Sequence, residues 1–288
     1  MNATISAQRI VVGYDGSDEA RWAVDWAAGE AERTGTQLQI LTAYQLAWPG
    51  AYYAVAAEQF ELARQAAEQT VAEIVARVRE RGTGIDVFGT AVDGLAAGAL
   101  LDLADAGAGT IVVGSRGSGG LTGLLMGSVS QQVATHSPVP VVVVRGRSAA
   151  TDGPVVVGVD GSASSDDALA QAFAAAQARG TELVAVRAHV TPPQPALPPP
   201  DLEAHERAAL DASLAPWLVR YPDVKVEALV AAGRAAKVLV GVSDTAQLVV
   251  VGSRGHGGFA GLLLGSVGQQ LMHHAECPVL IVHHRKAR

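Results

Sequence analysis

The chain has 288 residues, of which 49% are hydrophobic, and its formal net charge is −7. This length suits two domains of ordinary size, each with enough apolar residues to bury a core. The acidic balance and the lack of a Lys/Arg cluster argue against a nucleic-acid partner.

Three features bear on where the protein works. Residues 1–8 lack the basic start and following apolar stretch of a signal peptide. No apolar run approaches the roughly 18 residues that span a bilayer. The single cysteine, Cys277, cannot form an internal disulfide. We therefore expect a soluble, cytoplasmic protein with no membrane partner.

The first half alternates between apolar β-branched runs and amphipathic runs. We expect strands at residues 9–14, 38–43, 86–92, 110–113 and 139–144, and helices at 18–33, 58–81, 95–106 and 129–136. An aromatic loop, 44–55, precedes the long second helix. Strands that alternate with helices predict a parallel sheet with helices on both faces.

The same order restarts after a polar linker at residues 147–153. We expect strands at 155–159, 183–188, 224–230, 248–251 and 278–282, and helices ending at 179 and spanning 202–219, 235–243 and 267–274. A Pro-rich loop replaces the aromatic one, and Pro216 is expected to end or kink its helix. This internal repeat predicts an α/β protein of two tandem domains, 1–146 and 154–288.

Each half carries the same glycine-rich sequence directly after its fourth strand. The copies are Gly114-Ser115-Arg116-Gly117, nine residues, Gly127-Ser128, and Gly252-Ser253-Arg254-Gly255, nine residues, Gly265-Ser266. Each leads into a helix start, where backbone N–H groups are unpaired and the dipole adds about half a positive charge. Because glycine lets the backbone approach an anion closely, the pattern predicts a seat for a phosphate-bearing ligand. A plain helix cap with a surface loop is the alternative.

A second repeated sequence, Asp-Gly-Ser, follows the first strand of each half at Asp15 and Asp160. If strands 1 and 4 flank the point where strand order reverses, this sequence lies beside the glycine loop. Asp15 and Asp160 are then candidates to bind a ribose hydroxyl or a base edge. The alternative is that the sequence only caps the next helix.

With these two elements, each half resembles a complete domain of the universal stress protein family. Both halves carry the family's ATP-binding signature of Gly, two residues, Gly, nine residues and Gly-Ser/Thr, so the resemblance covers nearly the whole chain. It implies a Rossmann-like, doubly wound parallel sheet of five strands in the order 3-2-1-4-5 in each half. It also implies ATP under the loop, with adenine between the ends of strands 1, 2 and 4.

The resemblance also carries the family's ATP-contacting positions onto this chain. The first site is Gly13, Asp15, Ala43, Val113, Gly114, Gly117, Gly127, Ser128 and Val129. The second is Gly158, Asp160, Ala188, Val251, Gly252, Gly255, Gly265, Ser266 and Val267. We add Arg116 and Arg254 because a loop guanidinium can pair with a phosphate. A solvated loop arginine is the alternative.

The residues of the two sites favour a binding protein over an enzyme. Neither loop contains the lysine of the Walker sequence GxxxxGK[ST]. Asp15 and Asp160 offer only one carboxylate per site to Mg²⁺, and the paired histidines 273–274 and 283–284 point apart on a helix or strand. We expect a stress-response regulator or sensor that binds ATP, with Mg²⁺ as its counterion and with slow hydrolysis at most. A slow ATPase or phosphotransferase and a scaffold with vestigial sites are the alternatives.

The final strands of the two halves are sheet edges in the expected order. Universal stress proteins pair through this strand, so the resemblance implies that residues 141–144 and 279–282 pair within one chain as an intramolecular pseudo-dimer. An exposed apolar edge otherwise invites aggregation. A homodimer and an unidentified protein partner are further expectations.

Overall fold

The computed structural model describes residues 9–45, 53–82, 84–118, 126–190, 202–255 and 264–284. Its contacts divide the chain into two compact units, Met1–Val144 and Arg145–Arg288. The start of the chain at 1–8, most of the aromatic loop and the Pro-rich loop at 191–200 lie outside the described residues.

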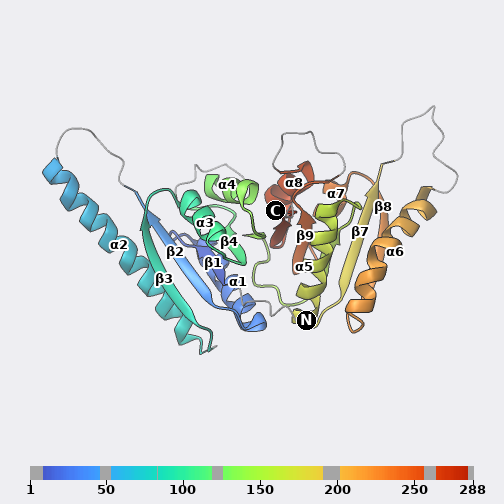
Figure 1. The fold of residues 1–288 in the computed structure, drawn as a ribbon, viewed down its shortest axis with the longest axis horizontal. Helices are drawn as coiled ribbons and strands as arrows, with labels where there is room; N and C mark the ends of the chain where they lie inside the picture. Colours follow the sequence, from blue (N-terminus) through green and yellow to red (C-terminus); the bar gives the residue numbers. More distant parts are fainter. Residues whose placement is uncertain are drawn as a thin grey trace. The chain divides into compact units, whose positions relative to one another are not determined.

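The first unit is a parallel sheet with helices between its strands (Figure 1). Its elements are β1 (Ile10–Gly13), α1 (Asp18–Thr34), β2 (Leu38–Tyr44), α2 (Tyr53–Glu80), β3 (Val87–Asp93), α3 (Ala96–Asp105), β4 (Thr110–Gly114), α4 (Ser128–His136) and β5 (Val141–Val144). The strand order is β3-β2-β1-β4-β5, with every neighbouring pair parallel. Right-handed crossovers put α1 and α2 on one face and α3 and α4 on the other.

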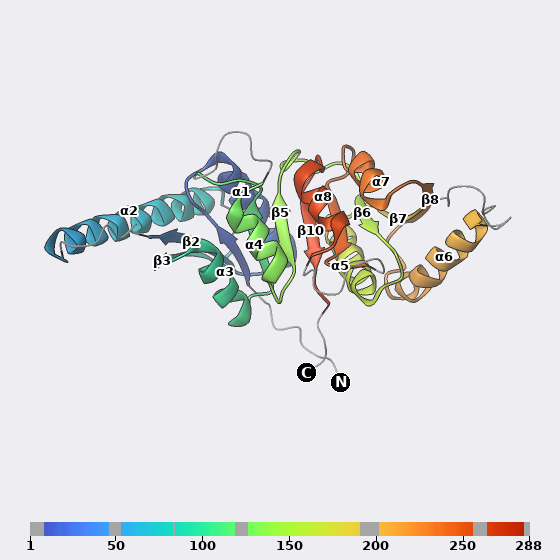
Figure 2. The ribbon, with the colours of Figure 1, turned by 90° about the horizontal axis from the view of Figure 1, so that it is seen from above.

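The second unit repeats this arrangement (Figure 2). Its elements are β6 (Val155–Gly158), α5 (Ala163–Arg179), β7 (Leu183–His189), α6 (Leu202–Arg220), β8 (Val226–Ala232), α7 (Ala235–Val242), β9 (Leu248–Gly252), α8 (Ser266–His274) and β10 (Val279–Val282). Its strand order is β8-β7-β6-β9-β10, again all parallel. The predicted order 3-2-1-4-5 and the α/β fold class are confirmed within each unit.

The central strands explain why the apolar runs in the sequence are continuous. Val11, Val12, Ile111 and Val112 have no exposed surface, because helices cover both faces of the sheet. The order also places the reversal point between β1 and β4, and between β6 and β9. None of the described helices is both long and apolar enough to cross a bilayer.

Several element boundaries differ from the sequence-based expectations. Helix α2 starts at Tyr53 rather than at 58, because residues 54–57 are mostly alanine, the strongest helix former. The predicted start of β8 at 224 is wrong, since the N–H of Val224 closes a turn onto the Tyr221 carbonyl at 3.2 Å. Strand β5 starts at Val141 rather than at 139. The Ser137 hydroxyl donates to the carbonyl of Val139 and accepts from its N–H, so these groups do not pair with a neighbouring strand.

Helix α6 does not end at Pro216, contrary to one of the two expected outcomes. Proline lacks the N–H that would bond the carbonyl four residues earlier, at position 212. Both positions lie on the exposed side of the helix, where water can satisfy that carbonyl. The helix therefore continues to Arg220.

Candidate functional site

The glycine-rich sequences close into loops at the carboxyl ends of β4 and β9. The N–H of Gly127 donates to the Ser115 carbonyl at 2.8 Å, and the N–H of Gly265 donates to the Ser253 carbonyl at 2.7 Å. These bonds hold the start of the following helix against the end of the preceding strand. Residues 119–125 and 256–263, which complete the loops and include His256, lie outside the described residues.

Helices α4 and α8 both begin without a side-chain cap. Their N-cap residues are Gly127 and Gly265, and glycine has no side chain that could accept a hydrogen bond from the first N–H groups of the helix. The first intrahelical donors are Gln131 and Gln269, each 3.1 Å from its N-cap carbonyl. The earlier N–H groups, from Ser128 and Ser266 onward, are therefore available to an anion, with the helix dipole adding positive potential.

The Asp-Gly-Ser sequences form the same turn in both units. Ser17 caps α1 by accepting from the N–H of Ala20 at 3.2 Å, and Ser162 caps α5 by accepting from Ser165 at the same distance. The aspartate holds the capping serine: Asp15 Oδ1 accepts from Ser17 N–H at 3.1 Å and from its hydroxyl at 2.6 Å. Gly16 adopts φ 84°, which glycine allows without strain. The helix cap is thus the serine, and the aspartate orients it.

Asp15 also braces the glycine loop. Its Oδ2 accepts from the backbone N–H of Ser118 at 2.7 Å, and a Cβ added to Gly117 would overlap this oxygen. Burial acts to raise the pKa of Asp15, but hydrogen bonds from Ser17 and Ser118 outweigh it and hold the pKa below its ordinary value. The carboxylate therefore stays ionised at neutral pH and links the end of β1 to the loop after β4.

Asp160 has the same place in the second unit. Its Oδ1 accepts from Ser162 N–H at 3.0 Å and from the Ser162 hydroxyl at 2.7 Å, and a Cβ at Gly255 would overlap its Oδ2. Sequence reasoning placed both aspartates near the ligand but missed this bracing role. Their contact with a ribose or base stays a prediction.

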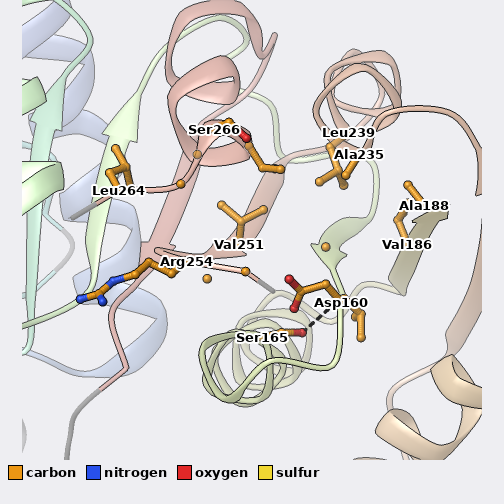
Figure 3. A pocket seen from close by; sticks show the side chains of 17 residues that line it. Asp160, Ser165, Val186, Ala188, Ala235, Leu239, Val251, Arg254, Leu264 and Ser266 are labelled. Atoms are coloured by element: carbon orange, nitrogen blue, oxygen red, sulfur yellow. Dashed lines mark hydrogen bonds between the residues drawn. The ribbon is translucent and has the colours of Figure 1, made fainter. Parts of the chain in front are cut away.

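A cavity of about 440 Å³ opens at this point in the second unit (Figure 3). Ligand pockets for small molecules typically have about 300–1,000 Å³. All ten residues that the sequence assigns to the second site line it, namely Gly158, Asp160, Ala188, Val251, Gly252, Arg254, Gly255, Gly265, Ser266 and Val267. The cavity therefore runs from the start of α8, past Asp160, to the end of β7.

Seven further residues line the cavity and were not assigned from the sequence. They are Val159, Ser165, Val186, Ala235, Leu239, Leu264 and Gly268. Leu239 and Ala235 come from α7, which the sequence predicts as a helix without a role in the site. They form an apolar part of the wall, and both Leu239 and Val251 lie close to Gly158 (Figure 3). No local pattern marks these residues, because their place depends on how α7 packs across the sheet.

The backbone of Ala188 supplies polar groups at the apolar end of the cavity. The pairing of β6 with β7 ends at Gly158↔Val186, and the last bond is Val159 N–H to the Val186 carbonyl at 2.8 Å. In a parallel strand, the N–H and C=O of one residue point to the same neighbouring strand, and every second residue points to the same side. Val186 and Ala188 therefore both face β6. Ala188 therefore points both groups to the side where β6 has ended. In the first unit Tyr14 N–H bonds the Leu41 carbonyl at 2.8 Å, so Ala43 is arranged alike.

The first unit brings its predicted site residues together in the same way. Gly127 lies against the loop, since a Cβ added to it would lie 3.4 Å from Arg116 Cα and 3.6 Å from Gly117 N. Gly13 packs against Leu100 of α3, as Gly158 packs against Leu239 of α7. Val113, Ser128 and Val129 lie at the end of β4 and the start of α4. In the described residues, no group of three or more His, Cys, Asp or Glu side chains is arranged to hold a metal ion.

The fold defines an α/β class of protein with a doubly wound parallel sheet in each unit, and comparison with known proteins identifies the family. The model of the universal stress protein family matches residues 6–145 and again residues 153–283. The chain belongs to the universal stress protein family, with two tandem domains of it.

Known relatives span nearly the whole chain. A universal stress protein of Mycolicibacterium smegmatis is 41% identical over 96% of this chain and 97% of its own length. One from Mycobacterium tuberculosis is 35% identical, with 98% of both chains covered. The crystal structure of a universal stress protein from Archaeoglobus fulgidus has a TM-score of 0.72 at 19% identity, covering 96% of this chain and 97% of that one, which supports the fold.

Proposed function

We propose that each unit binds one adenine nucleotide, with ATP as the main ligand, and that the chain acts as an ATP-dependent regulator or sensor in the stress response. The observation that carries this proposal is the cavity of the second unit. It joins an uncapped helix start, suited to phosphate, to an apolar slot with free backbone groups, suited to a base. The first unit repeats both ends of this arrangement.

The apolar end of the cavity fits adenine better than guanine. Adenine offers a donor, its amino group, beside an acceptor, N1, and the C=O and N–H of Ala188 complement that pair. Guanine presents an acceptor, O6, where adenine has the amino group. With guanine bound, O6 would face the Ala188 carbonyl, and both acceptors would be left without a donor. This mismatch costs about 1–3 kcal/mol of binding free energy. Val186, Leu239 and Val251 supply apolar surface for either ring.

The polar end supports phosphate binding through the backbone. The N–H groups of Ser266 and Val267 begin α8, and the Ser266 side chain lies at the cavity wall (Figure 3). Asp160 lies close to Gly255 of the loop at the opposite wall. A phosphate seated at the start of α8 would gain several charge-assisted hydrogen bonds without displacing any side-chain cap.

The aspartates do not fit a Mg²⁺ site. Both oxygens of Asp15 already accept hydrogen bonds from backbone or hydroxyl donors, and Asp160 Oδ1 accepts two. A carboxylate used in this way does not present its oxygens to a hydrated Mg²⁺, which prefers near-ideal octahedral geometry. We therefore assign the protein no metal-dependent step, and binding rather than turnover is the proposed activity.

Titration calorimetry on nucleotide-free protein tests this function. We expect ATP to bind, and GTP to bind at least about tenfold more weakly because of the mismatch at Ala188. A chain that binds no adenine nucleotide, or that prefers GTP, would overturn the proposal. Sustained multiple-turnover phosphate release that stops on Gly117→Ala or Gly255→Ala would instead favour the slow ATPase.

The pairing of the final strands, 141–144 and 279–282, stays a prediction, as does a homodimer. If the two edges pair within the chain, their backbone amides should exchange hydrogen as slowly as those of central strands, because paired amides must open before exchange. Hydrogen exchange with mass spectrometry measures this. Amides of both strands that exchange at loop rates would disprove the pairing.

A further inference from the structure

The arginine in the glycine loop has different surroundings in the two units. In the first unit, the guanidinium of Arg116 forms an ion pair with the Glu19 carboxylate at 2.7 Å. Glu19 lies in the first turn of α1, and its side chain is only 19% exposed. Arg116 is therefore held against α1 by a carboxylate that has little freedom to move away.

The second unit has no carboxylate at the matching place. The end of β4 packs on the backbone of Glu19, since a Cβ at Gly114 would lie 2.8 Å from its carbonyl carbon and oxygen. A Cβ at Gly252 would lie 2.8 Å from the same atoms of Ser164, so Ser164 is the counterpart of Glu19. The Ser164 hydroxyl donates to the Val282 carbonyl at 3.2 Å and offers no charge to an arginine.

Arg254 is correspondingly less restrained than Arg116. Within the described part of the chain, its guanidinium has no hydrogen-bond or ion-pair partner, and the residue is exposed at the cavity wall. Figure 3 shows its side chain turned away from Asp160. Exposed side chains change rotamer within nanoseconds, so this guanidinium can turn to a phosphate without breaking an existing ion pair.

The local charges point the same way. In the first unit Glu19, in the first turn of α1, contacts the loop arginine, whereas Asp166, the acidic residue in the first turn of α5, is exposed and forms no ion pair with Arg254 among the described residues. The other charges near these turns are paired or face outward: Asp18 with Arg21 on α1, and Asp167 with His284 beside exposed Asp166 on α5. Among the described residues, a carboxylate therefore contacts the loop arginine only in the first unit.

We infer that the two units respond to different features of the nucleotide: the second unit, through Arg254, discriminates ATP from AMP, whereas the first unit binds adenine nucleotides with much less regard to phosphate number. This inference rests on the proposed function. Arg254 makes charge-assisted contacts to the β- and γ-phosphates, which AMP lacks. In the first unit the same contacts require Arg116 to leave Glu19, and the freed carboxylate then repels the phosphates. In one chain, occupancy of the first unit would then follow the total concentration of adenine nucleotide, and occupancy of the second unit would follow the ratio of ATP to AMP.

The test isolates each unit and compares ATP with AMP by titration calorimetry. Gly127→Asp leaves only the second site open, and Gly265→Asp leaves only the first. We expect the ratio of the AMP to the ATP dissociation constant to be at least about tenfold larger for the second unit. Arg254→Gln should weaken ATP binding at least about fivefold more than AMP binding. Glu19→Gln should strengthen ATP binding to the first unit about threefold or more.

Arg207→Gln provides the matched control. This substitution removes one positive charge from α6, where Arg207 is paired with Asp211. No residue of α6 lines the cavity, so the ratio of the AMP to the ATP dissociation constant should not change. Arg254→Gln and Glu19→Gln in the otherwise unaltered chain keep the test independent of the glycine variants. Equal ratios in the two units, or equal losses of ATP and AMP in Arg254→Gln, would overturn this inference alone. Absence of all ATP and AMP binding would overturn the proposed function with it.

Discussion

Gly127→Asp is expected to abolish ATP binding in the first unit while its fold becomes no less stable. Gly127 is the N-cap of α4, with φ −79° and ψ 152°, the conformation in which aspartate caps helices best. The new carboxylate would accept the N–H groups that the phosphate needs and would repel the phosphate, at about 4 kcal/mol for unit charges 4 Å apart near a protein surface. We expect affinity to fall more than about 100-fold, and Gly265→Asp to do the same in the second unit.

Two variants at the same position separate charge from space. Gly127→Ala adds only a Cβ, which would lie 3.4 Å from Arg116 Cα and needs a small shift. Gly127→Asn caps the helix as well as aspartate but without charge. ATP affinity should therefore fall in the order Gly, Ala, Asn and Asp, while melting temperature does not follow that order. An aspartate variant with the affinity of the unaltered protein would contradict the assignment of the phosphate seat.

Gly114→Ala and Gly252→Ala are expected to destabilise their units strongly. The added Cβ would lie 2.8 Å from backbone atoms of Glu19 or Ser164, and backbone cannot move aside as a flexible side chain can. Overpacking of this kind costs about 1–3 kcal/mol and occasionally more. For a unit of this size the melting temperature should fall by several degrees.

Helical glycines of the same units give matched controls for these two substitutions. Gly98 in α3 and Gly241 in α7 have no atom within 4 Å of an added Cβ, so their replacement by alanine should stabilise by about 0.5–1 kcal/mol. Cys277 reports opening of the second unit, since burial raises the pKa of its thiol to about 12 and leaves it inert while folded. The measurement is the rate at which an alkylating reagent modifies Cys277 in the two variants. If that rate is no higher in Gly252→Ala than in Gly241→Ala, the close packing of β9 on α5 is wrong.

The local parts of the site could be predicted from the sequence because they depend on short spacings. The glycine loop, the helix start that follows it and the Asp-Gly-Ser turn each lie within one strand-to-helix connection. The internal repeat then predicted two copies, and the strand order placed Asp15 beside the loop. These features follow from backbone geometry that neighbouring residues determine.

Other features depend on contacts between distant elements and were missed. The Arg116–Glu19 ion pair joins residues after β4 to the first turn of α1, and the bracing of Ser118 N–H by Asp15 spans a similar separation. Leu239 lines the cavity only because α7 crosses the sheet next to β6 and β7. Side-chain choices of this kind follow from tertiary packing, which periodicity in a single sequence does not encode.

The number of ATP molecules bound per chain tests the central claim most directly. Titration calorimetry on nucleotide-free protein should give a stoichiometry near two for the unaltered chain, near one for Gly127→Asp or Gly265→Asp, and none for the double variant. Binding of ATP by the double variant at the affinity of the unaltered protein would show that nucleotide sits elsewhere, and would contradict the account.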